Sequence, residues 1–130
     1  CRLATCRGCH TEFAHTVDCL KKGYSKKQFG LVNTTLGIVA TNAKFNKKEV
    51  TKIAQMSHAG LIKTITPVHT TFDGDLIFAL SMGEIDADIN KVGVLSDFVV
   101  CEAVKRAVKK ADGFGIVPAF KDISKGWKPA

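Results

Sequence analysis

Two short apolar runs, separated by one helix length, constrain the fold of this chain more than any other feature. The first run is Leu36-Gly37-Ile38-Val39-Ala40-Thr41, and the second is Leu76-Ile77-Phe78-Ala79-Leu80-Ser81-Met82. Both are almost continuously apolar, which is typical of strands that are covered on both faces. A helix between them supplies the return path that lays the second strand alongside the first. The sequence therefore predicts an α/β fold.

The segments between and after these runs have helical patterns. Asn46 followed by Glu49 resembles a capping box and predicts a helix over residues 47–61, which Pro67 ends. A second helix is predicted over about residues 91–111, after an acidic loop at 83–90. A short strand is predicted over residues 116–120. The order strand, helix, strand, helix predicts one pair of α and β layers.

Composition limits the classes of protein that are possible. The chain has 130 residues, 45% of them hydrophobic, enough for one domain with a core. No apolar run is long enough to span a membrane and no secretory segment opens the chain, so we expect a soluble, cytoplasmic protein without a membrane partner. The net charge is +7, but the lysines cluster at helix ends, which favours a solvated surface over a nucleic-acid site.

Residues 1–32 differ from the rest and are interpreted as a leader segment of unknown role before an αβ domain at 33–130. The leader contains Cys6-Arg7-Gly8-Cys9-His10, the signature of covalent haem attachment. With Cys1, His15 and Cys19, this segment could also supply zinc ligands. A haem needs an apolar pocket, and zinc normally takes two paired ligand clusters, so we favour reduced thiols or a leader foreign to the domain.

The tripeptide Asn33-Thr34-Thr35 lies at the start of the first apolar run and suggests a nucleophile. A threonine hydroxyl is a poor nucleophile unless a base lies beside it. Cleavage between Asn33 and Thr34 would free the α-amino group of Thr34, which titrates near pH ~7.7–8.0 and can serve as that base. Taken alone, the same tripeptide is weak evidence and favours a turn that leads into a strand.

Asp73-Gly74-Asp75 precedes the second apolar run, and in an extended loop its two carboxylates can project the same way. The alternative is a turn with solvated carboxylates. Thr35 could orient the neighbouring threonine or pair across strands, and His69 could act as a base or simply pack the loop. His58 falls on the apolar side of the first helix and is interpreted as a core histidine.

Residues 33–86 resemble the β-chain segment of the DmpA-type aminopeptidases, most closely the threonine-nucleophile branch that includes the nylon-oligomer endohydrolases. The matching segments are NTTLGIVATNAKF at 33–45, KKEVTKIAQMSHAGL at 47–61 and ITPVHTTFDGDLIFALSMGEID at 65–86. The resemblance implies a four-layer αββα sandwich of the N-terminal-nucleophile type. It also implies self-cleavage before Thr34 and hydrolysis of peptide or amide bonds. Thr34 would be the nucleophile, Asp73 and Asp75 would position its amine, and no cofactor or metal would be needed.

Members of this family carry a longer α chain before the nucleophile, and that chain supplies further active-site groups, including oxyanion donors. Residues 1–32 are too short to replace it and show no matching segments. We therefore expect a companion α-type chain, a small peptide or amide substrate, an oligomer, and little activity from this chain alone. If the hydrolase interpretation holds, at least one of Asp73 and Asp75 should lie within hydrogen-bonding reach of Thr34, directly or through one water. The alternative is a non-catalytic domain, or a metal-binding or interaction module led by the Cys/His segment.

Overall fold

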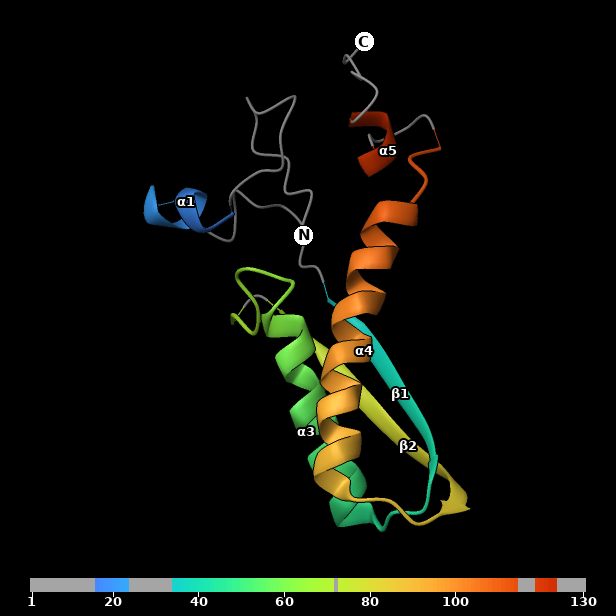
Figure 1. Ribbon diagram of the computed structural model, residues 1–130. Helices are drawn as coiled ribbons and strands as arrows, with labels where there is room; N and C mark the ends of the chain where they lie inside the picture. The colour runs from blue at the N-terminus through green and yellow to red at the C-terminus, as the bar shows by residue number, and fades with distance from the viewer. Residues whose placement is uncertain (1–15, 24–33, 72, 115–118, 124–130) are drawn as a thin grey trace.

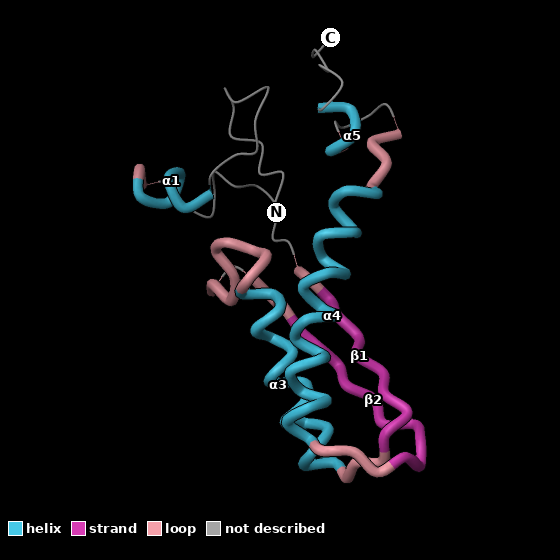
Figure 2. The backbone as a smooth tube through the Cα atoms, viewed as in Figure 1, coloured by secondary structure: helices cyan, strands magenta, loops and turns pink. Residues whose placement is uncertain are grey.

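The computed structural model of the chain describes residues 16–23, 34–71, 73–114 and 119–123 (Figure 1). Its elements in chain order are α1 (Thr16–Lys21), β1 (Leu36–Ala43), α3 (Lys47–Ile62), β2 (Leu76–Ile85), α4 (Ile89–Lys110) and α5 (Phe120–Ile123). The predicted order of strand, helix, strand and helix is confirmed by β1, α3, β2 and α4 (Figure 2).

The two strands pair in parallel, with Leu36 opposite Leu76 and the register maintained to Thr41 opposite Ser81. The register then shifts, and Ala43 pairs with Ile85. Beyond this shift, the amide of Lys44 donates to the carbonyl of Ile85 at 2.9 Å. The predicted loop at 83–90 is therefore wrong at its start, because the shifted pairing extends β2 to Ile85.

Helix α3 begins where the sequence predicts. The Asn46 side chain accepts hydrogen bonds from the amides of Lys48 and Glu49, and the Glu49 carboxylate accepts one from the amide of Asn46 at 2.8 Å. This reciprocal capping box satisfies backbone donors that the first turn of a helix leaves unpaired. The capping box fixes the direction in which the chain enters α3, the helix that connects β1 to β2.

Helices α3 and α4 lie side by side on one face of the strand pair (Figure 1). A Cβ atom at Gly60 would lie 2.5 Å from the Asp97 carbonyl oxygen, so the two helix backbones approach closely there. The hydroxyls of Ser57 and Ser96 are buried between the helices and joined at 2.8 Å. The apolar core below them consists of Val39, Ile53, Leu61, Ile65, Ile77 and Val100.

The other face of the strand pair is apolar and uncovered within the described chain. Five of its side chains are between 45% and 80% exposed: Leu36, Ile38, Phe78, Leu80 and Met82. Within the described residues, helices α3 and α4 cover only one face of the strands, so the predicted cover of the second face is not found there. Apolar faces of this kind mark a contact surface.

Helix α4 begins after Asp88, whose side chain accepts a hydrogen bond from the amide of Lys91 at 2.9 Å. The predicted strand at 116–120 is wrong at Phe120, where α5 begins, and residues 115–118 lie outside the described chain. The Asp122 carboxylate accepts from the amide of Ala119 at 2.9 Å, which satisfies the start of α5. No helix in the described part is long and apolar enough to cross a membrane.

Candidate active site

The parallel register brings Thr34 and Gly74 level with each other at the start of the two strands. A Cβ atom placed on Gly74 would lie 3.0 Å from the Thr34 hydroxyl oxygen. Glycine at this position therefore lets the Thr34 side chain lie directly against the turn between Asp73 and Asp75. The candidate nucleophile and the candidate carboxylates are thus at the same end of the sheet, as the sequence predicts.

Asp75 connects the start of β1 to the loop before β2. Its Oδ1 accepts a hydrogen bond from the amide of Thr35 at 2.8 Å, and its Oδ2 accepts one from the amide of His69 at 3.4 Å. The next residue, Leu76, donates its amide to the Thr35 carbonyl at 2.9 Å. Asp75 therefore holds the backbone that immediately follows Thr34. Among the described residues, no hydrogen bond joins the Thr34 hydroxyl to either carboxylate, so the expected direct hydrogen bond from Thr34 to Asp73 or Asp75 is not found.

Asp73 forms hydrogen bonds across the turn that begins at Thr70. Its Oδ2 accepts from the Thr70 hydroxyl at 2.7 Å and from the Thr70 amide at 3.3 Å, while its own amide donates to the Thr70 carbonyl at 3.0 Å. The two carboxylates therefore differ in their contacts. Asp75 contacts the nucleophile's strand, whereas Asp73 shapes the loop.

Two histidines form a pair beside Asp75. The Nδ1 atom of His58, on α3, lies 3.2 Å from the Nε2 atom of His69, whose backbone φ of 56° is in the left-handed region. Burial lowers the pKa of His58 below 6.5, and the charge of His69 lowers it further, while the Asp75 carboxylate acts in the opposite direction. His58 is half-buried and hydrogen-bonded to the loop, so its interpretation as a core histidine is wrong. Its pairing with His69 was not predicted.

We expect the His58–His69 pair to make the stability of the fold depend on pH. Because folding lowers the His58 pKa below 6.5, the unfolded chain binds the proton more readily. The stabilisation by neutral His58 is therefore complete above pH ~6.5 and is lost as pH falls below that value. We expect the melting temperature to fall between pH 7 and pH 5, and to fall less in His58→Gln, which retains a hydrogen-bonding side chain but does not titrate there. Equal pH slopes for the two proteins in thermal melts would contradict this assignment.

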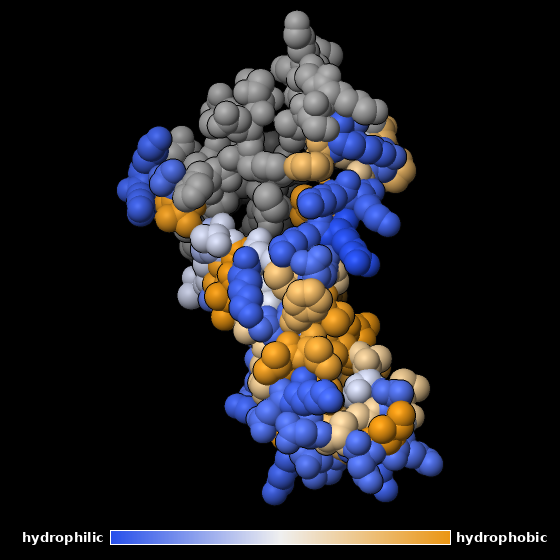
Figure 3. All heavy atoms as spheres, viewed as in Figure 1, coloured by the Kyte–Doolittle hydropathy of each residue, from blue (hydrophilic) through white to orange (hydrophobic). Residues whose placement is uncertain are grey.

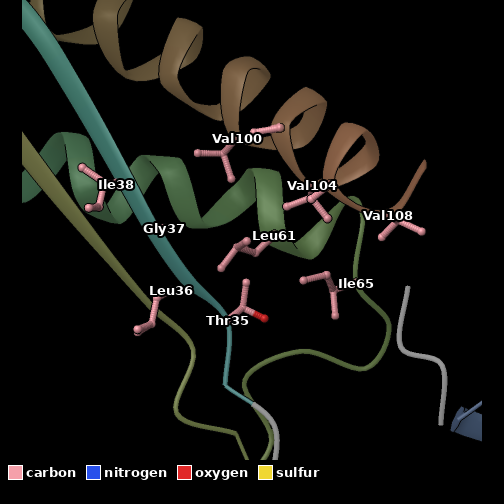
Figure 4. Close-up of a pocket in the computed structure, with 11 residues that line it drawn as sticks. Thr35, Leu36, Gly37, Ile38, Leu61, Ile65, Val100, Val104 and Val108 are labelled. Atoms are coloured by element: carbon pink, nitrogen blue, oxygen red, sulfur yellow. The ribbon is translucent and has the colours of Figure 1, made fainter. Parts of the chain in front are cut away.

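Thr35 faces the opposite side of the strand from Thr34. Its side chain points into an apolar cavity of about 420 Å³ between β1, the end of α3 and α4 (Figure 4). Exposure alternates from Thr34 to Val39, so Thr34 shares the uncovered side of the sheet with Leu36 and Ile38. The candidate nucleophile therefore faces the side of the sheet on which the described chain provides no second layer.

Several predicted features fall outside the described residues. Asn33 is one of them, as are the leader residues Cys1, Cys6, Cys9, His10 and His15. Within the described ranges, no group of three or more His, Cys, Asp or Glu side chains could hold a metal ion. The acidic residues Glu84, Asp86 and Asp88 are exposed. Glu84 lies near the end of β2 that is far from Asp75, and Asp86 and Asp88 follow that end.

The sequence as a whole decides the family. The family model for peptidase family S58 matches residues 9–117. The chain belongs to peptidase family S58. The resemblance inferred from residues 33–86 is confirmed, and the expectation that residues 1–32 show no match to the family is wrong from residue 9 onward.

Similar proteins in this family are longer than the chain. An uncharacterized aminopeptidase of Mycobacterium leprae is 32% identical over 110 residues, which cover 73% of this chain and 30% of that protein. An uncharacterized aminopeptidase of Mycobacterium tuberculosis is 29% identical over 109 residues, covering 72% of this chain and 32% of that protein. A 6-aminohexanoate-oligomer endohydrolase of Kocuria sp. is 29% identical over 90 residues, which cover 59% of this chain and 25% of that protein. This S58 chain therefore spans about a third or less of each of these relatives.

Proposed function

We propose that this S58 chain is the nucleophile-bearing part of a self-processing amide-bond hydrolase or aminopeptidase, with Thr34 as its nucleophile. The observation that carries the proposal is the junction of the two strand starts. There, Gly74 lies against the Thr34 hydroxyl and Asp75 binds the amide of Thr35 at 2.8 Å. Relatives named as aminopeptidases and as a 6-aminohexanoate-oligomer endohydrolase support amide-bond chemistry.

Processing would begin at the Asn33-Thr34 bond. The Thr34 hydroxyl attacks the Asn33 carbonyl, the acyl group moves from nitrogen to oxygen, and water hydrolyses the resulting ester. This sequence leaves a carboxyl group on Asn33 and a new α-amino group on Thr34. The amine then lies beside the hydroxyl of its own residue, where it can accept the hydroxyl proton.

Substrate hydrolysis would use the same hydroxyl. The Thr34 oxygen attacks the substrate carbonyl while the α-amine takes its proton, and the proton passes to the leaving amine as the amide bond breaks. Water, deprotonated by the same amine, then hydrolyses the acyl-threonine ester and regenerates the hydroxyl. Asp75 contributes by holding the Thr35 amide, so that the backbone carrying the nucleophile stays fixed. Asp73 contributes by holding the loop that carries Asp75.

The site requires a further layer for completion. Thr34 shares the uncovered apolar side of the sheet with Leu36 and Ile38, which are 69% and 71% exposed. A second sheet packed there would bury these side chains, form the four-layer αββα sandwich, and enclose Thr34 between the sheets. Oxyanion donors, each worth ~10²–10³ in rate, would come from that layer. A companion α-type polypeptide, or further sequence of the same protein, would supply it.

Reconstitution tests the proposed function. The chain would be co-expressed with the portion of the Mycobacterium leprae relative that it does not match, and assayed on an aminoacyl anilide and a 6-aminohexanoate oligomer. We expect release of amine from at least one substrate by the complex, and a rate lower by ~10²-fold or more from the chain alone. Co-elution in gel filtration establishes that the complex has formed. A co-eluting complex without activity on either substrate, or equal activity from the chain alone, would contradict the proposal.

A further inference from the structure

Helix α4 is apolar on two opposite sides. Gly93, Ser96 and Val100 are buried on the side that faces α3. The opposite side carries what we call the outer stripe, whose four members are 62%, 54%, 63% and 58% exposed: Val94, Leu95, Phe98 and Val99. In the space-filling view, apolar side chains gather over the middle of α4 (Figure 3). Single exposed apolar residues are ordinary, but four adjacent ones on one helix face indicate a contact surface.

Charged residues continue the outer stripe in both directions along the helix. Lys91, Leu95, Phe98, Glu102 and Lys105 follow one another at steps of four or three residues, so they share one side of α4. Lys91 precedes Leu95 by one such step, and Glu102 follows Phe98 by an equal step. The acidic cap Asp88 lies at one end of this side and the basic Lys105 at the other, where Lys105 Nζ lies 2.9 Å from Glu102 Oε1 of the same helix.

We propose that the outer stripe of α4 docks against the same stripe of a second copy of this chain, with the two helices antiparallel. A twofold axis between Leu95 and Phe98 places Leu95 against Phe98 of the partner subunit. By the same symmetry, Phe98 lies against Leu95 of the partner subunit. The same operation places Lys91 opposite Glu102 of the partner subunit and Asp88 opposite Lys105 of the partner subunit. Each copy therefore contributes oppositely charged groups on both sides of the apolar centre.

The charge pattern also selects the direction of the pairing. In a parallel pair, Lys91 would face Lys91 of the partner subunit, and Glu102 would face Glu102 of the partner subunit, so like charges would meet. The antiparallel arrangement replaces both repulsions with attractions and sets the two helix dipoles in opposite directions. Antiparallel self-association is thus the arrangement that the sequence of this helix face favours.

This interface is separate from the proposed contact with a companion layer. The helices cover one face of the strand pair, whereas Leu36, Ile38 and Phe78 lie on the other face. The outer stripe lies on the side of α4 opposite Val100 and Val104, which line the cavity between α4 and β1. Pairing through α4 leaves the open sheet face accessible, so the proposal does not depend on the proposed enzymatic function.

Sedimentation of the complete chain and its charge variants tests the pairing. We expect the wild-type chain to form a species of twice its 14.0 kDa mass in a concentration-dependent equilibrium. Lys91→Glu and Glu102→Lys should each weaken dimerisation roughly tenfold, because each places like charges opposite one another in both halves of the interface. The double variant Lys91→Glu with Glu102→Lys restores opposite charges and should return the dissociation constant to near the wild-type value.

Apolar variants give an independent measurement. Phe98→Glu should weaken the dimer by roughly a hundredfold or more, because it removes the central apolar contact twice. Phe114→Glu is the matched control, since Phe114 is 83% exposed and lies outside α4, and it should leave the dimer intact. Circular dichroism would verify that each variant is folded. A monomeric wild-type chain, a double charge variant without recovery, or a dimer lost in Phe78→Glu but kept in Phe98→Glu would each overturn the proposal.

Discussion

Replacement of Thr34 by alanine should abolish cleavage of the Asn33-Thr34 bond and lower amide hydrolysis by the assembled enzyme on the order of 10⁴–10⁶-fold. The alanine variant has no hydroxyl to attack the Asn33 carbonyl, so neither the new α-amine nor the acyl-ester can form. Thr34 is exposed at the start of β1, so its substitution should cost little stability. Mass spectrometry of the purified chain measures the cleavage, and amine release measures the turnover.

Two variants make this result specific to Thr34. Thr34→Ser keeps a hydroxyl and should retain measurable cleavage and hydrolysis. Thr35→Val is the matched control, because its side chain faces the apolar cavity rather than Gly74 and its amide can still donate to Asp75. Normal processing in Thr34→Ala, or an equally large loss in Thr35→Val, would remove Thr34 as the nucleophile.

Replacement of Asp75 by alanine should have the second largest effect and lower the rate of amide hydrolysis by about 10²–10³-fold. Losses of this size follow when a group that fixes catalytic geometry is removed. In Asp75→Ala, the amide of Thr35 loses its 2.8 Å acceptor, and the amide of His69 loses its more distant one. An unpaired, partly buried amide costs about 1–3 kcal/mol, so this variant should also melt at a lower temperature.

A second substitution separates charge from positioning. Asp75→Asn retains one carbonyl oxygen that can accept from the Thr35 amide but lacks the negative charge. If Asp75 acts by holding the backbone, Asp75→Asn should keep most of its stability and recover part of the activity lost in Asp75→Ala. Asp86→Asn, exposed beyond the far end of β2, serves as the control and should behave as wild type. Full activity in Asp75→Ala would contradict the assignment.

The elements of the fold could be predicted because their signals are local. The Asn46–Glu49 capping box and the apolar runs at 36–41 and 76–82 depend on neighbours in sequence, and the structure confirms them. The meeting of Thr34 with the Asp73–Asp75 turn could also be anticipated, since a helical connection returns the second strand beside the first. Local pattern thus located both the strands and the end of the sheet where the candidate site lies.

The remaining features depend on contacts between distant segments, which a single sequence does not reveal. The hydrogen bond from the Thr35 amide to Asp75 requires the exact register of β1 and β2. The contact between His58 and His69 requires the end of α3 to fold back against the loop. Continuous apolar runs likewise indicate that both faces of the strands are buried, but they do not indicate which polypeptide covers each face.

Asp73 illustrates the limit of reasoning from spacing. The Asp-Gly-Asp motif predicted that both carboxylates can project the same way. In the structure, the Asp73 carboxylate accepts from the Thr70 hydroxyl, whereas the Asp75 carboxylate accepts from the amide of Thr35 at the start of β1. Equal spacing from a glycine does not fix the side-chain partners, because turn hydrogen bonds compete for short carboxylates. The two residues therefore have different proposed roles, one in the loop and one at the nucleophile's strand.

Intact-mass measurement of the incubated chain, followed by sequencing of any new amino terminus, tests the central claim most directly. The measurement would be made on the chain together with its companion layer, because the site faces the open side of the sheet. If Thr34 is a self-generated amino-terminal nucleophile, the 14.0 kDa chain should divide into two fragments, the larger beginning at Thr34. A chain that keeps its full mass in the assembled complex, or that divides at another bond, would contradict the assignment of Thr34.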